Sequence, residues 1–252
     1  MRFLPLMLCA ALLAACATSP LGRSQLMMVS ADEMNQMGVA SFNDLKQKTP
    51  ITRNAKTSTY VSCVARAITT ELHDGRAWEV QVFEDNQVNA FALPGAKIGV
   101  YTGLLKIATT QDQLAAVIGH EVSHVLANHS AERVSEQMAG QLGSQVVGAA
   151  TGIDPQLFGI ATNVFYTLPG SRTQESEADL LGLDLMASAG FDPRQSVTLW
   201  QNMMNAGGQK PPQMLSTHPS DETRIQQLQA RLPLDIPVYE NARAAGKRPH
   251  CG

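Results

Sequence analysis

Apolar residues recur at two spacings along the chain, and together these predict a mostly helical α+β fold. Over residues 31–48 and 58–72 they recur every three to four positions, which is the period of a helix with one buried face. Residues 78–83 (WEVQVF) alternate apolar and polar, which is the period of a half-buried strand. Two more short strands are predicted on either side of the turn at Pro94-Gly95, so the sheet is small.

Two later helices begin with a capping-box pattern, in which two side chains each bond the other's backbone. The first begins at Thr110 and is apolar nearly all round, which predicts a buried helix. The second begins at Ser171 and runs to about Ala189, where Gly190 is a stop signal. Residues 139–168 are rich in Gly and Ala and are predicted to form packed helices that cover residues 120–124, which are discussed below. A helix is predicted after Asp192-Pro193, a loop at 207–213 and a last helix from Ser220 to about Arg231.

The first residues are not expected to belong to this fold. Residues 3–15 are almost wholly apolar, which is too short for a membrane span but fits the core of a signal peptide. The run ends in LAAC, which resembles a bacterial lipobox, so we predict a lipoprotein signal peptide over residues 1–15 and lipid attachment at Cys16. An ordinary secretory signal with an incidental cysteine is the alternative. Ala17 rather than aspartate follows, so the lipobox resemblance implies an outer-membrane lipoprotein on the periplasmic face.

The rest of the chain is predicted to be one domain behind a short tether. Residues 16–25 have the composition of a flexible, lipidated tether, and residues 26–252 are long enough for one domain with a sizeable core. The chain has 19 basic and 22 acidic residues, and this balance gives no indication of nucleic-acid binding. Because the apolar run at residues 3–15 is too short to span a membrane, we expect contact with a membrane through the lipid anchor only.

Two cysteines, Cys63 and Cys251, lie within the predicted domain. In an oxidising periplasm a disulfide between them would tie the C-terminal tail to the body of the domain. Two unpaired thiols are the alternative.

Residues 120–124 read HEVSH, the pattern H-E-x-x-H, and are the most informative stretch of the chain. Because residues four apart share one face of a helix, His120 and His124 can hold one metal ion, with Glu121 beside them as a general base. Two histidines and a glutamate inside a buried helix are costly without partners, and a metal ion is such a partner. The motif therefore predicts one Zn²⁺ per chain.

A catalytic zinc site needs a third protein ligand and one open position. The three-histidine pattern would place glycine at residue 127 and histidine at residue 130, but these are Ala127 and Ser130, which excludes that class. His129 lies five residues after His124, about 140° further around a continuous helix, so we expect it to point elsewhere.

A glutamate from a downstream helix is the remaining source of the third ligand. Glu175 and Asp179 lie four apart on the helix predicted from Ser171, so Glu175 can bind the metal while Asp179 bonds a ligand imidazole. A solvated acidic face is the alternative for this pair. The other glutamates weighed were Glu177, which points away from that face, Glu132 and Glu136, which are expected to be solvated, and Glu222.

Four segments in a fixed order carry a resemblance to a known family. They are residues 89–105 (NAFALPGAKIGVYTGLL), 120–124, 171–179 (SRTQESEAD) and 218–224 (HPSDETR). The chain resembles the zinc metallopeptidases related to the CAAX prenyl proteases, HtpX, BepA and LoiP, and most of all the LoiP-type periplasmic lipoproteins. The resemblance implies a mostly helical metalloprotease domain of the zincin (gluzincin) type with a small mixed β-sheet.

The same resemblance implies roles for single residues. His218 would reach the active site and stabilise the oxyanion, and Arg224 would position Glu175 or His218. A further hypothesis is that His218 takes the fourth zinc position in a resting state. Without the resemblance, a surface histidine before a proline would be the simpler interpretation of His218. The resemblance also implies His120, His124 and Glu175 as zinc ligands and Glu121 as the base. Asp179 would hold a ligand imidazole without binding the metal itself.

The strand at Ile98, Gly99 and Val100 is predicted to bind substrate. An extended peptide can add to a sheet edge through main-chain hydrogen bonds with little demand on its sequence. An ordinary sheet strand is the alternative. Such binding suits a zinc-dependent endopeptidase that cleaves unfolded or misassembled envelope proteins for quality control, with the outer-membrane assembly machinery as a further partner.

Two other functions were weighed against the endopeptidase. One is a non-proteolytic zinc lipoprotein that acts as a chaperone in outer-membrane protein assembly, and the other is a different zinc hydrolase, such as an amidase. Glu121 favours a catalytic site, because a structural zinc site needs no base and usually closes four ligands.

Overall fold

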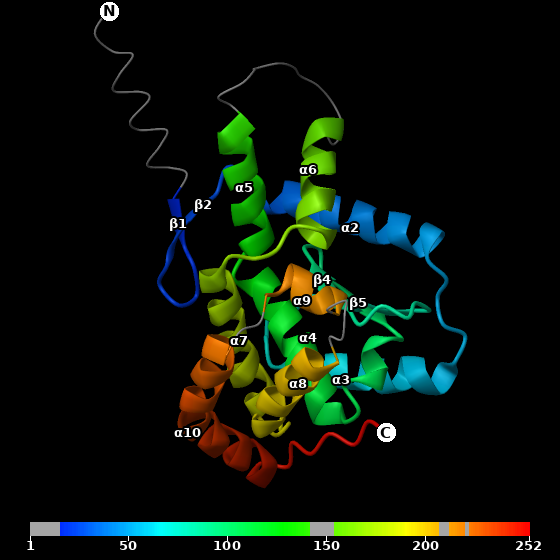
Figure 1. Ribbon diagram of the computed structural model, residues 1–252, viewed down its shortest axis with the longest axis vertical. Coiled ribbons are helices and arrows are strands. Elements are labelled where there is room, and N and C mark those ends of the chain that lie inside the picture. Colours follow the sequence, from blue (N-terminus) through cyan, green and yellow to red (C-terminus); the bar gives the residue numbers. More distant parts are fainter. Residues whose placement is uncertain (1–15, 142–153, 207–211, 220–221) are drawn as a thin grey trace, which may run out of the picture.

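The computed structural model describes residues 16–141, 154–206, 212–219 and 222–252, and most of these are helical (Figure 1). The mostly helical α+β class predicted from the sequence is therefore confirmed. The strands are β1 (Cys16–Thr18), β2 (Ser24–Leu26), β3 (Glu79–Phe83), β4 (Ala90–Leu93) and β5 (Lys97–Tyr101). The helices are α2 (Ala31–Lys48), α3 (Ala55–Thr70), the 3-10 helix η1 (Leu104–Lys106), α4 (Gln111–Leu126), α5 (His129–Gln141), α6 (Pro155–Tyr166), α7 (Arg172–Ser188), α8 (Arg194–Asn205), α9 (Gln213–Thr217) and α10 (Glu222–Ala244).

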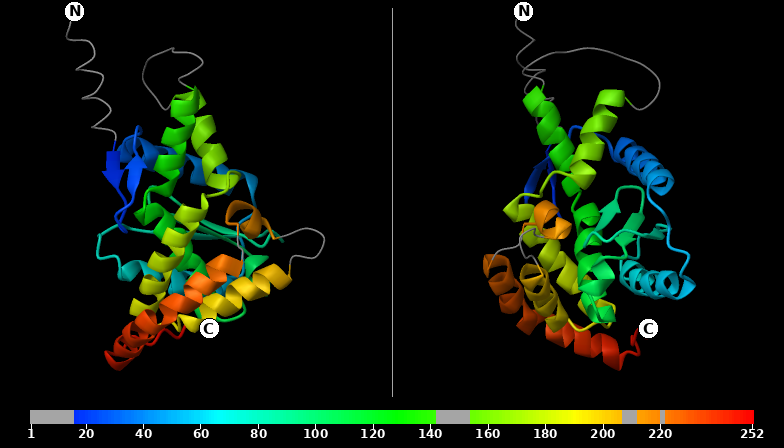
Figure 2. Two further views of the ribbon diagram at one scale, coloured as in Figure 1. Left: turned by 60° about the vertical axis from the view of Figure 1, so that its left-hand side comes forward. Right: turned by 45° about the vertical axis from the view of Figure 1, so that its right-hand side comes forward.

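Helix α4 runs through the centre of the molecule, and the other elements lie on two sides of it (Figure 2). On one side it packs against strand β4 and helix α3, and the sheet lies between α2 and α3. On the other side it packs along α7 and α8, which α10 covers. Every residue of α4 from Gln113 to Val125 is buried, as its apolar surface predicts.

The three-stranded sheet has the order β3-β5-β4, with β5 parallel to β3 and antiparallel to β4. Ile98, Gly99 and Val100 therefore lie in the central strand, and the prediction that they offer a free sheet edge is wrong. The ring of Phe91 also covers Gly99 so closely that a Cβ there would lie 2.1 Å from it. The edge on the α4 side is β4.

Helix caps fix where the two helices of the site begin. The Thr110 hydroxyl accepts a hydrogen bond from the Gln113 backbone N–H, while the Gln113 side chain accepts from Thr109 instead of Thr110. The full capping box is present at the start of α7, where Ser171 and Gln174 each accept from the other's backbone N–H. The Ser220 cap predicted for α10 lies outside the described residues.

The chain bends sharply between α4 and α5. Asn128 adopts φ 53°, a left-handed conformation that asparagine tolerates better than most residues. As a result α4 ends at Leu126 and a separate helix begins at His129. The direction predicted for His129 assumed one continuous helix, so it does not apply.

The N-terminal residues expected to be a flexible tether form an ordered hairpin instead. Strands β1 and β2 pair antiparallel, with Ala17 opposite Gln25, and both Ser19 and Gln25 are buried. The backbone N–H of Met28 donates to Ser135 on α5 at 2.8 Å, which fixes the end of the hairpin to the domain. The predicted signal peptide, residues 1–15, lies outside the described residues.

Cys63 on α3 and Cys251 in the C-terminal tail form a disulfide, with a Cα–Cα distance of 5.5 Å. The predicted pairing is confirmed, and the bridge ties the tail to α3. Among the described segments, none of the helices combines the length and the hydropathy that crossing a membrane requires.

Candidate metal centre

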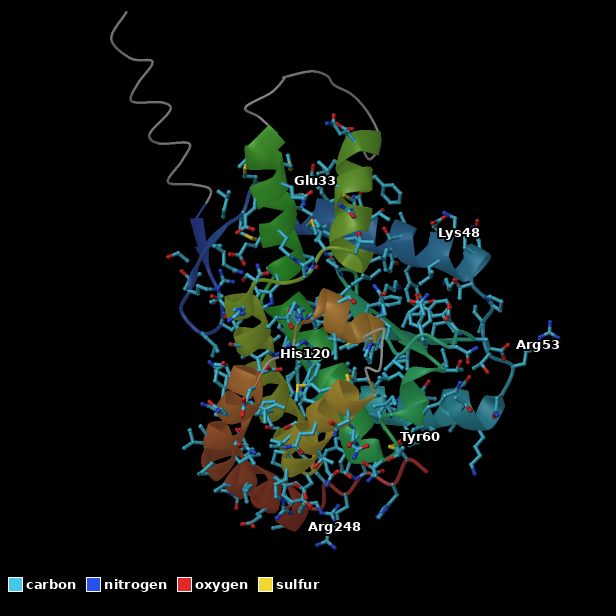
Figure 3. All side chains as sticks on the ribbon, in the orientation of Figure 1. Glu33, Lys48, Arg53, Tyr60, His120 and Arg248 are labelled. Atoms are coloured by element: carbon cyan, nitrogen blue, oxygen red, sulfur yellow. A yellow bond between two sulfur atoms is a disulfide. The ribbon has the colours of Figure 1, made fainter. Side chains whose placement is uncertain are left out.

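His120 and His124 on α4 point at the carboxylate of Glu175 on α7, deep in the molecule. Their Nε2 atoms lie 3.1 Å apart, and they lie 3.4 Å and 3.5 Å from the two Glu175 carboxylate oxygens. Figure 3 shows His120 near the centre of the molecule, whereas Arg53 and Arg248 lie at its periphery. The structure thus brings together the three residues predicted to be ligands.

These separations fit one zinc ion. Ligands about 2.0–2.1 Å from a tetrahedral Zn²⁺ stand about 3.4 Å apart, and two imidazoles with one carboxylate are a donor set that zinc prefers. All three side chains are buried, so their mutual approach is costly unless an ion lies among them.

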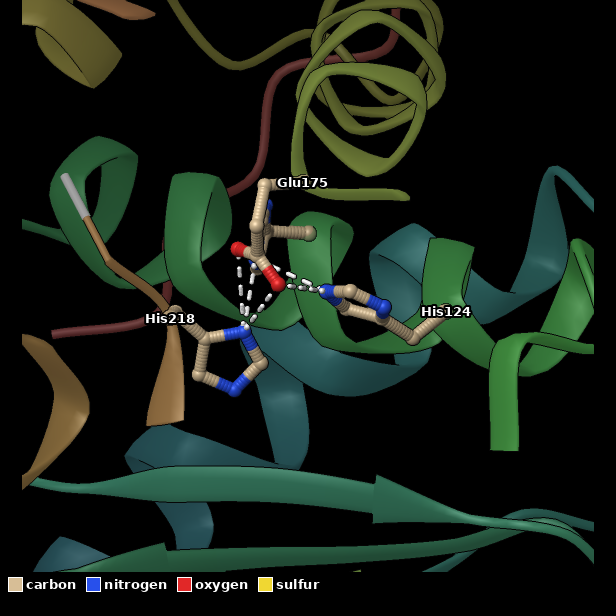
Figure 4. A group of neighbouring side chains, drawn as sticks. His124, Glu175 and His218 are labelled. Atoms are coloured by element: carbon tan, nitrogen blue, oxygen red, sulfur yellow. Dashed lines mark hydrogen bonds and ion pairs between the residues drawn. The ribbon is translucent and has the colours of Figure 1, made fainter. Parts of the chain in front are cut away.

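His218 completes a group of four potential ligands. It lies at the end of α9, and its Nδ1 is 3.2 Å from both Glu175 oxygens and 3.2 Å from His120 Nε2 (Figure 4). The ligand atoms of the group, His120, His124, Glu175 and His218, all lie within 4.8 Å of one another. The structure therefore places His218 at the site, where its role is open to test.

Asp179 and Arg224 lie directly outside the ligands. The Asp179 carboxylate lies 2.9 Å from Nδ1 of His120, on the side away from Glu175. Arg224 donates two parallel hydrogen bonds of 2.7 Å to Asp179 and lies 3.1 Å from Glu175. Its guanidinium also stacks over Trp200, 4.4 Å from the ring centre, so its position is fixed on several sides. Arg224 thus contacts both carboxylates of α7. It also donates a 3.3 Å hydrogen bond to the backbone carbonyl of His218.

Buried charges in the site shift each other's pKa. Burial opposes the ionised form of Glu175, but the neighbouring His218 and His124 outweigh it and hold its pKa well below the ordinary value. Burial likewise disfavours the charged form of His120, but hydrogen bonds to Asp179 and Glu175 raise its pKa to about 9. The Glu175 carboxylate is therefore anionic, which suits a cation between it and the two imidazoles.

Glu121 follows His120 directly on α4 and lines a small cavity with His124 and His218. It is buried, and burial raises the pKa of its carboxyl above the ordinary value. Among the described residues its Oε1 has no hydrogen-bond partner, and it lies 3.4 Å from Nε2 of His218. A buried carboxylate with a free oxygen beside a metal site is poised to accept a proton.

A small cavity of about 20 Å³ lies among Glu121, His124, His218 and strand β4. It has room for about one water molecule and not for a peptide. Thr217 and His218, at the end of α9, line it on one side, and Phe165 and Tyr166 of α6 line it as well.

Two buried residues near the site make contacts that the sequence does not indicate. His129 does not join the ligand group, but its Nδ1 lies 2.8 Å from Nδ1 of His124. Glu132, expected to be solvated, is buried and pairs with Arg23. For His129 the local signal is Asn128, because this residue marks the break between the two helices. The burial of Glu132 depends on its contact with Arg23, which lies in a distant part of the chain.

An HExxH helix, a glutamate ligand from a second helix and a small mixed sheet define a metallopeptidase domain of the zincin type. The chain belongs to peptidase family M48, whose model matches residues 52–232. Metallopeptidases of this family are zinc-dependent, and the four-residue group could hold one metal ion, so the predicted zinc cofactor is confirmed.

Named relatives come from eukaryotes and bacteria. The chain is 40% identical over 180 residues to the mitochondrial metalloendopeptidase OMA1 of Schizosaccharomyces pombe, covering 70% of this chain and 53% of the relative. It is 41% identical over 160 residues to the Arabidopsis thaliana OMA1, covering 64% and 32%. It is 27% identical over 223 residues to the Escherichia coli beta-barrel assembly-enhancing protease, covering 81% and 45%. The chain thus spans about half or less of the length of these relatives.

Proposed function

We propose that the protein is a zinc-dependent endopeptidase that hydrolyses peptide bonds of unfolded or misassembled proteins. The observation that carries this proposal is the buried Glu121 carboxylate, which lines the same small cavity as His124 and His218 and has one oxygen without a hydrogen-bond partner among the described residues. A structural zinc site has no use for such a base. Membership of family M48 and the peptidase names of the relatives support the same reaction.

His120, His124 and Glu175 would hold the zinc ion, which when bound supplies a Lewis acid for the scissile carbonyl and makes water a nucleophile near neutral pH. Glu121 takes a proton from the water as the water oxygen bonds to the carbonyl carbon. The same carboxyl then gives that proton to the leaving amine as the C–N bond breaks. His218 is placed to donate a hydrogen bond to the oxyanion, and losing one such donor typically costs about 10²–10³ in rate.

Strand β4 is the proposed platform for the substrate backbone, in place of β5. The Asn89 carbonyl bonds to Tyr101 of β5, whereas the Val88 carbonyl bonds outward to Met214 on α9. Because backbone groups alternate along a strand, those of Ala90 and Ala92 face the α4 side, beside Glu121. An extended peptide can pair with this edge next to the metal site.

Binding of a peptide at that edge would require the end of α9 or of α6 to move, because the cavity holds only about one water. In the closed arrangement His218 stands within ligand distance of the metal group, so we infer that it takes the fourth zinc position in a resting state. Peptide binding at β4 would then displace His218, which becomes the oxyanion donor.

The proposed setting is the periplasmic face of the outer membrane, in the manner of LoiP-type lipoproteins. The support is the LAAC sequence ending at Cys16, which would carry the lipid. One relative is named a beta-barrel assembly-enhancing protease, so misassembled outer-membrane proteins and their assembly machinery are the proposed substrates and partners. Replacing Cys16 with serine should release the protein from membranes.

Digestion of casein and of an unfolded outer-membrane protein by the full-length chain tests the proposed reaction. We expect Glu121→Gln to slow cleavage by about 10²–10⁴ while zinc content is unchanged. Glu136→Gln, on the exposed face of α5, is the matched control and should cleave like wild type. If wild type and Glu121→Gln cleave equally little, the proposal fails; binding of the unfolded protein without cleavage would then favour a chaperone.

A further inference from the structure

The two histidine ligands are each held from outside, but by different parts of the chain. His120 is held by Asp179, which Arg224 fixes in place from α10. His124 is held by two side chains in series on the side away from Glu175. Its Nδ1 lies 2.8 Å from Nδ1 of His129, and Nε2 of His129 lies 3.2 Å from Glu177 on α7.

The contact with Glu177 determines which nitrogen of each imidazole carries the proton. The ring of His129 lies between a carboxylate, which can only accept, and a second imidazole, and in its neutral form it has one donor and one acceptor. Its Nε2–H donates to the Glu177 carboxylate, which leaves Nδ1 as the acceptor. His124 must then donate from its own Nδ1, which leaves the Nε2 lone pair free toward Glu175 and the metal position.

Glu177 is itself held by the N-terminal hairpin. Arg23, in the turn between β1 and β2, donates from Nε to Glu177 at 3.1 Å, and the backbone N–H of Leu21 donates to the other carboxylate oxygen at 3.3 Å. Arg23 also forms a two-pronged ion pair with Glu132 on α5. Glu132 and Glu177 are both buried, so Arg23 compensates two buried negative charges at once.

The hairpin makes further polar contacts on the same surface. The Gln25 side chain donates to the Ala127 carbonyl at 2.7 Å, next to the helix break, and to Glu132 at 3.0 Å. Gln174, in the first turn of α7, donates to Glu132 at 2.8 Å from the other side. The hairpin therefore contacts the end of α4, the start of α5 and the start of α7, all of which carry or flank metal-site residues.

We propose that the hairpin at residues 16–26 is a positioning element of the metal site, through which Arg23 acts on His124 by way of Glu177 and His129. The proposal rests on the proposed function only in that the site holds zinc. The hairpin begins at Cys16, the predicted point of lipid attachment, so the segment next to the anchor is the same segment that supports a zinc ligand. Partners outside the ligands of a metal site are typically worth 10–100-fold in metal affinity.

The test measures zinc binding to the full-length chain in detergent, by competition with a chelator, for Arg23→Gln, Glu177→Gln and Arg231→Gln. Arg231 pairs with Asp184 at the α7–α10 contact, with a similar exposed fraction to Arg23, and serves as the matched control. We expect the zinc Kd to rise about 10–100-fold in the first two variants and to stay within twofold in the control. Glu177→Gln leaves the Arg23–Glu132 pair intact, so it serves where Arg23→Gln folds poorly.

Two substitutions of His129 separate positioning from bulk stability. His129→Asn can still accept a hydrogen bond from His124, whereas His129→Leu cannot, so the Asn variant should retain more zinc affinity and a visible spectrum of the Co²⁺ form closer to wild type. Unchanged Kd in Arg23→Gln and Glu177→Gln, or an equal loss in Arg231→Gln, would overturn the proposal. Because the readout is metal binding, the result does not depend on whether any peptide is cleaved.

Discussion

The backbones of Gly119 on α4 and Gly182 on α7 are in direct contact where the two helices meet. A Cβ on Gly182 would lie 2.8 Å from the backbone nitrogen of His120, and a Cβ on Gly119 would lie 2.9 Å from the Gly182 carbonyl oxygen. This close approach sets the distance over which α7 presents Glu175 and Asp179 to the two histidines of α4.

Gly182→Ala should therefore separate the two helices and damage the site. We expect a loss of about 1–3 kcal/mol in the free energy of unfolding, because the added methyl meets backbone atoms that cannot move aside. Zinc should bind more weakly as well. Denaturant unfolding and zinc content measure the two effects. Gly159→Ala, at an exposed position of α6 with no atom within 4 Å of the new methyl, should be neutral or stabilising by up to about 1 kcal/mol, and equal losses in both variants would refute the account.

Arg224→Met should destabilise the protein by about 3–5 kcal/mol, because it removes the two-pronged positive partner of the buried Asp179 carboxylate. Arg224→Lys keeps the charge but cannot form both parallel hydrogen bonds, so its loss should be smaller. Chemical unfolding of the metal-free protein isolates the effect from zinc. Arg194→Met removes an exposed ion pair with Asp192 and should cost less than about 1 kcal/mol. A loss in Arg224→Met no larger than in this control would contradict the structure.

A pH dependence should come from Asp235 on α10. Its side chain is 1% exposed, and burial together with the neighbouring Asp184 raises its pKa to about 7. The folded state then holds a proton that the unfolded state releases near pH 4, so stability is greatest at low pH and falls as pH rises toward 7.

Asp235→Asn removes this titration, so the variant should gain about 2–3 kcal/mol relative to wild type between pH 5 and pH 8. Urea unfolding at both pH values measures the difference. Asp44→Asn, in an exposed pair with Lys48, should show little change at either pH. The same gap between wild type and Asp235→Asn at both pH values would show that Asp235 does not titrate in this way.

Breaking the disulfide should lower stability without altering the metal site. Cys63 and Cys251 are 188 residues apart, so their bridge restricts a long loop in the unfolded chain, and Cys251→Ser should cost about 2–5 kcal/mol. The Gln111 side chain still donates to the Pro249 carbonyl and accepts from the backbone N–H of residue 251, so zinc affinity should stay within twofold of wild type. A large loss of zinc affinity on reduction would mean that the tail supports the site.

Local patterns in the sequence located the metal site well. His120 and His124 follow from one motif, and Glu175 and Asp179 follow from their four-residue spacing behind the cap at Ser171, because helix periodicity alone determines which residues share a face. His218 had no such local signal, and only the resemblance over four segments brought it to the site.

Apart from the disulfide, the polar contacts between distant segments could not be predicted. The pairs of Arg23 with Glu132 and Glu177 span 109 and 154 residues, and no periodicity links residues so far apart. Strand order is equally non-local, so the sequence could not show that Ile98–Val100 is central and β4 is the edge. The contact of His129 with His124 was not predicted for a different reason, since one left-handed residue, Asn128, restarts the helix.

The central claim is that Glu121 acts as the base of a site that holds one zinc ion. Titrating the metal-free full-length chain with zinc, while measuring bound zinc and casein cleavage together, tests it most directly. We predict that wild-type cleavage rises with bound zinc and saturates at one ion per chain, and that Glu121→Gln binds zinc equally well but cleaves at least about 100-fold more slowly. Cleavage that is independent of zinc, or equal in wild type and Glu121→Gln, would contradict the account.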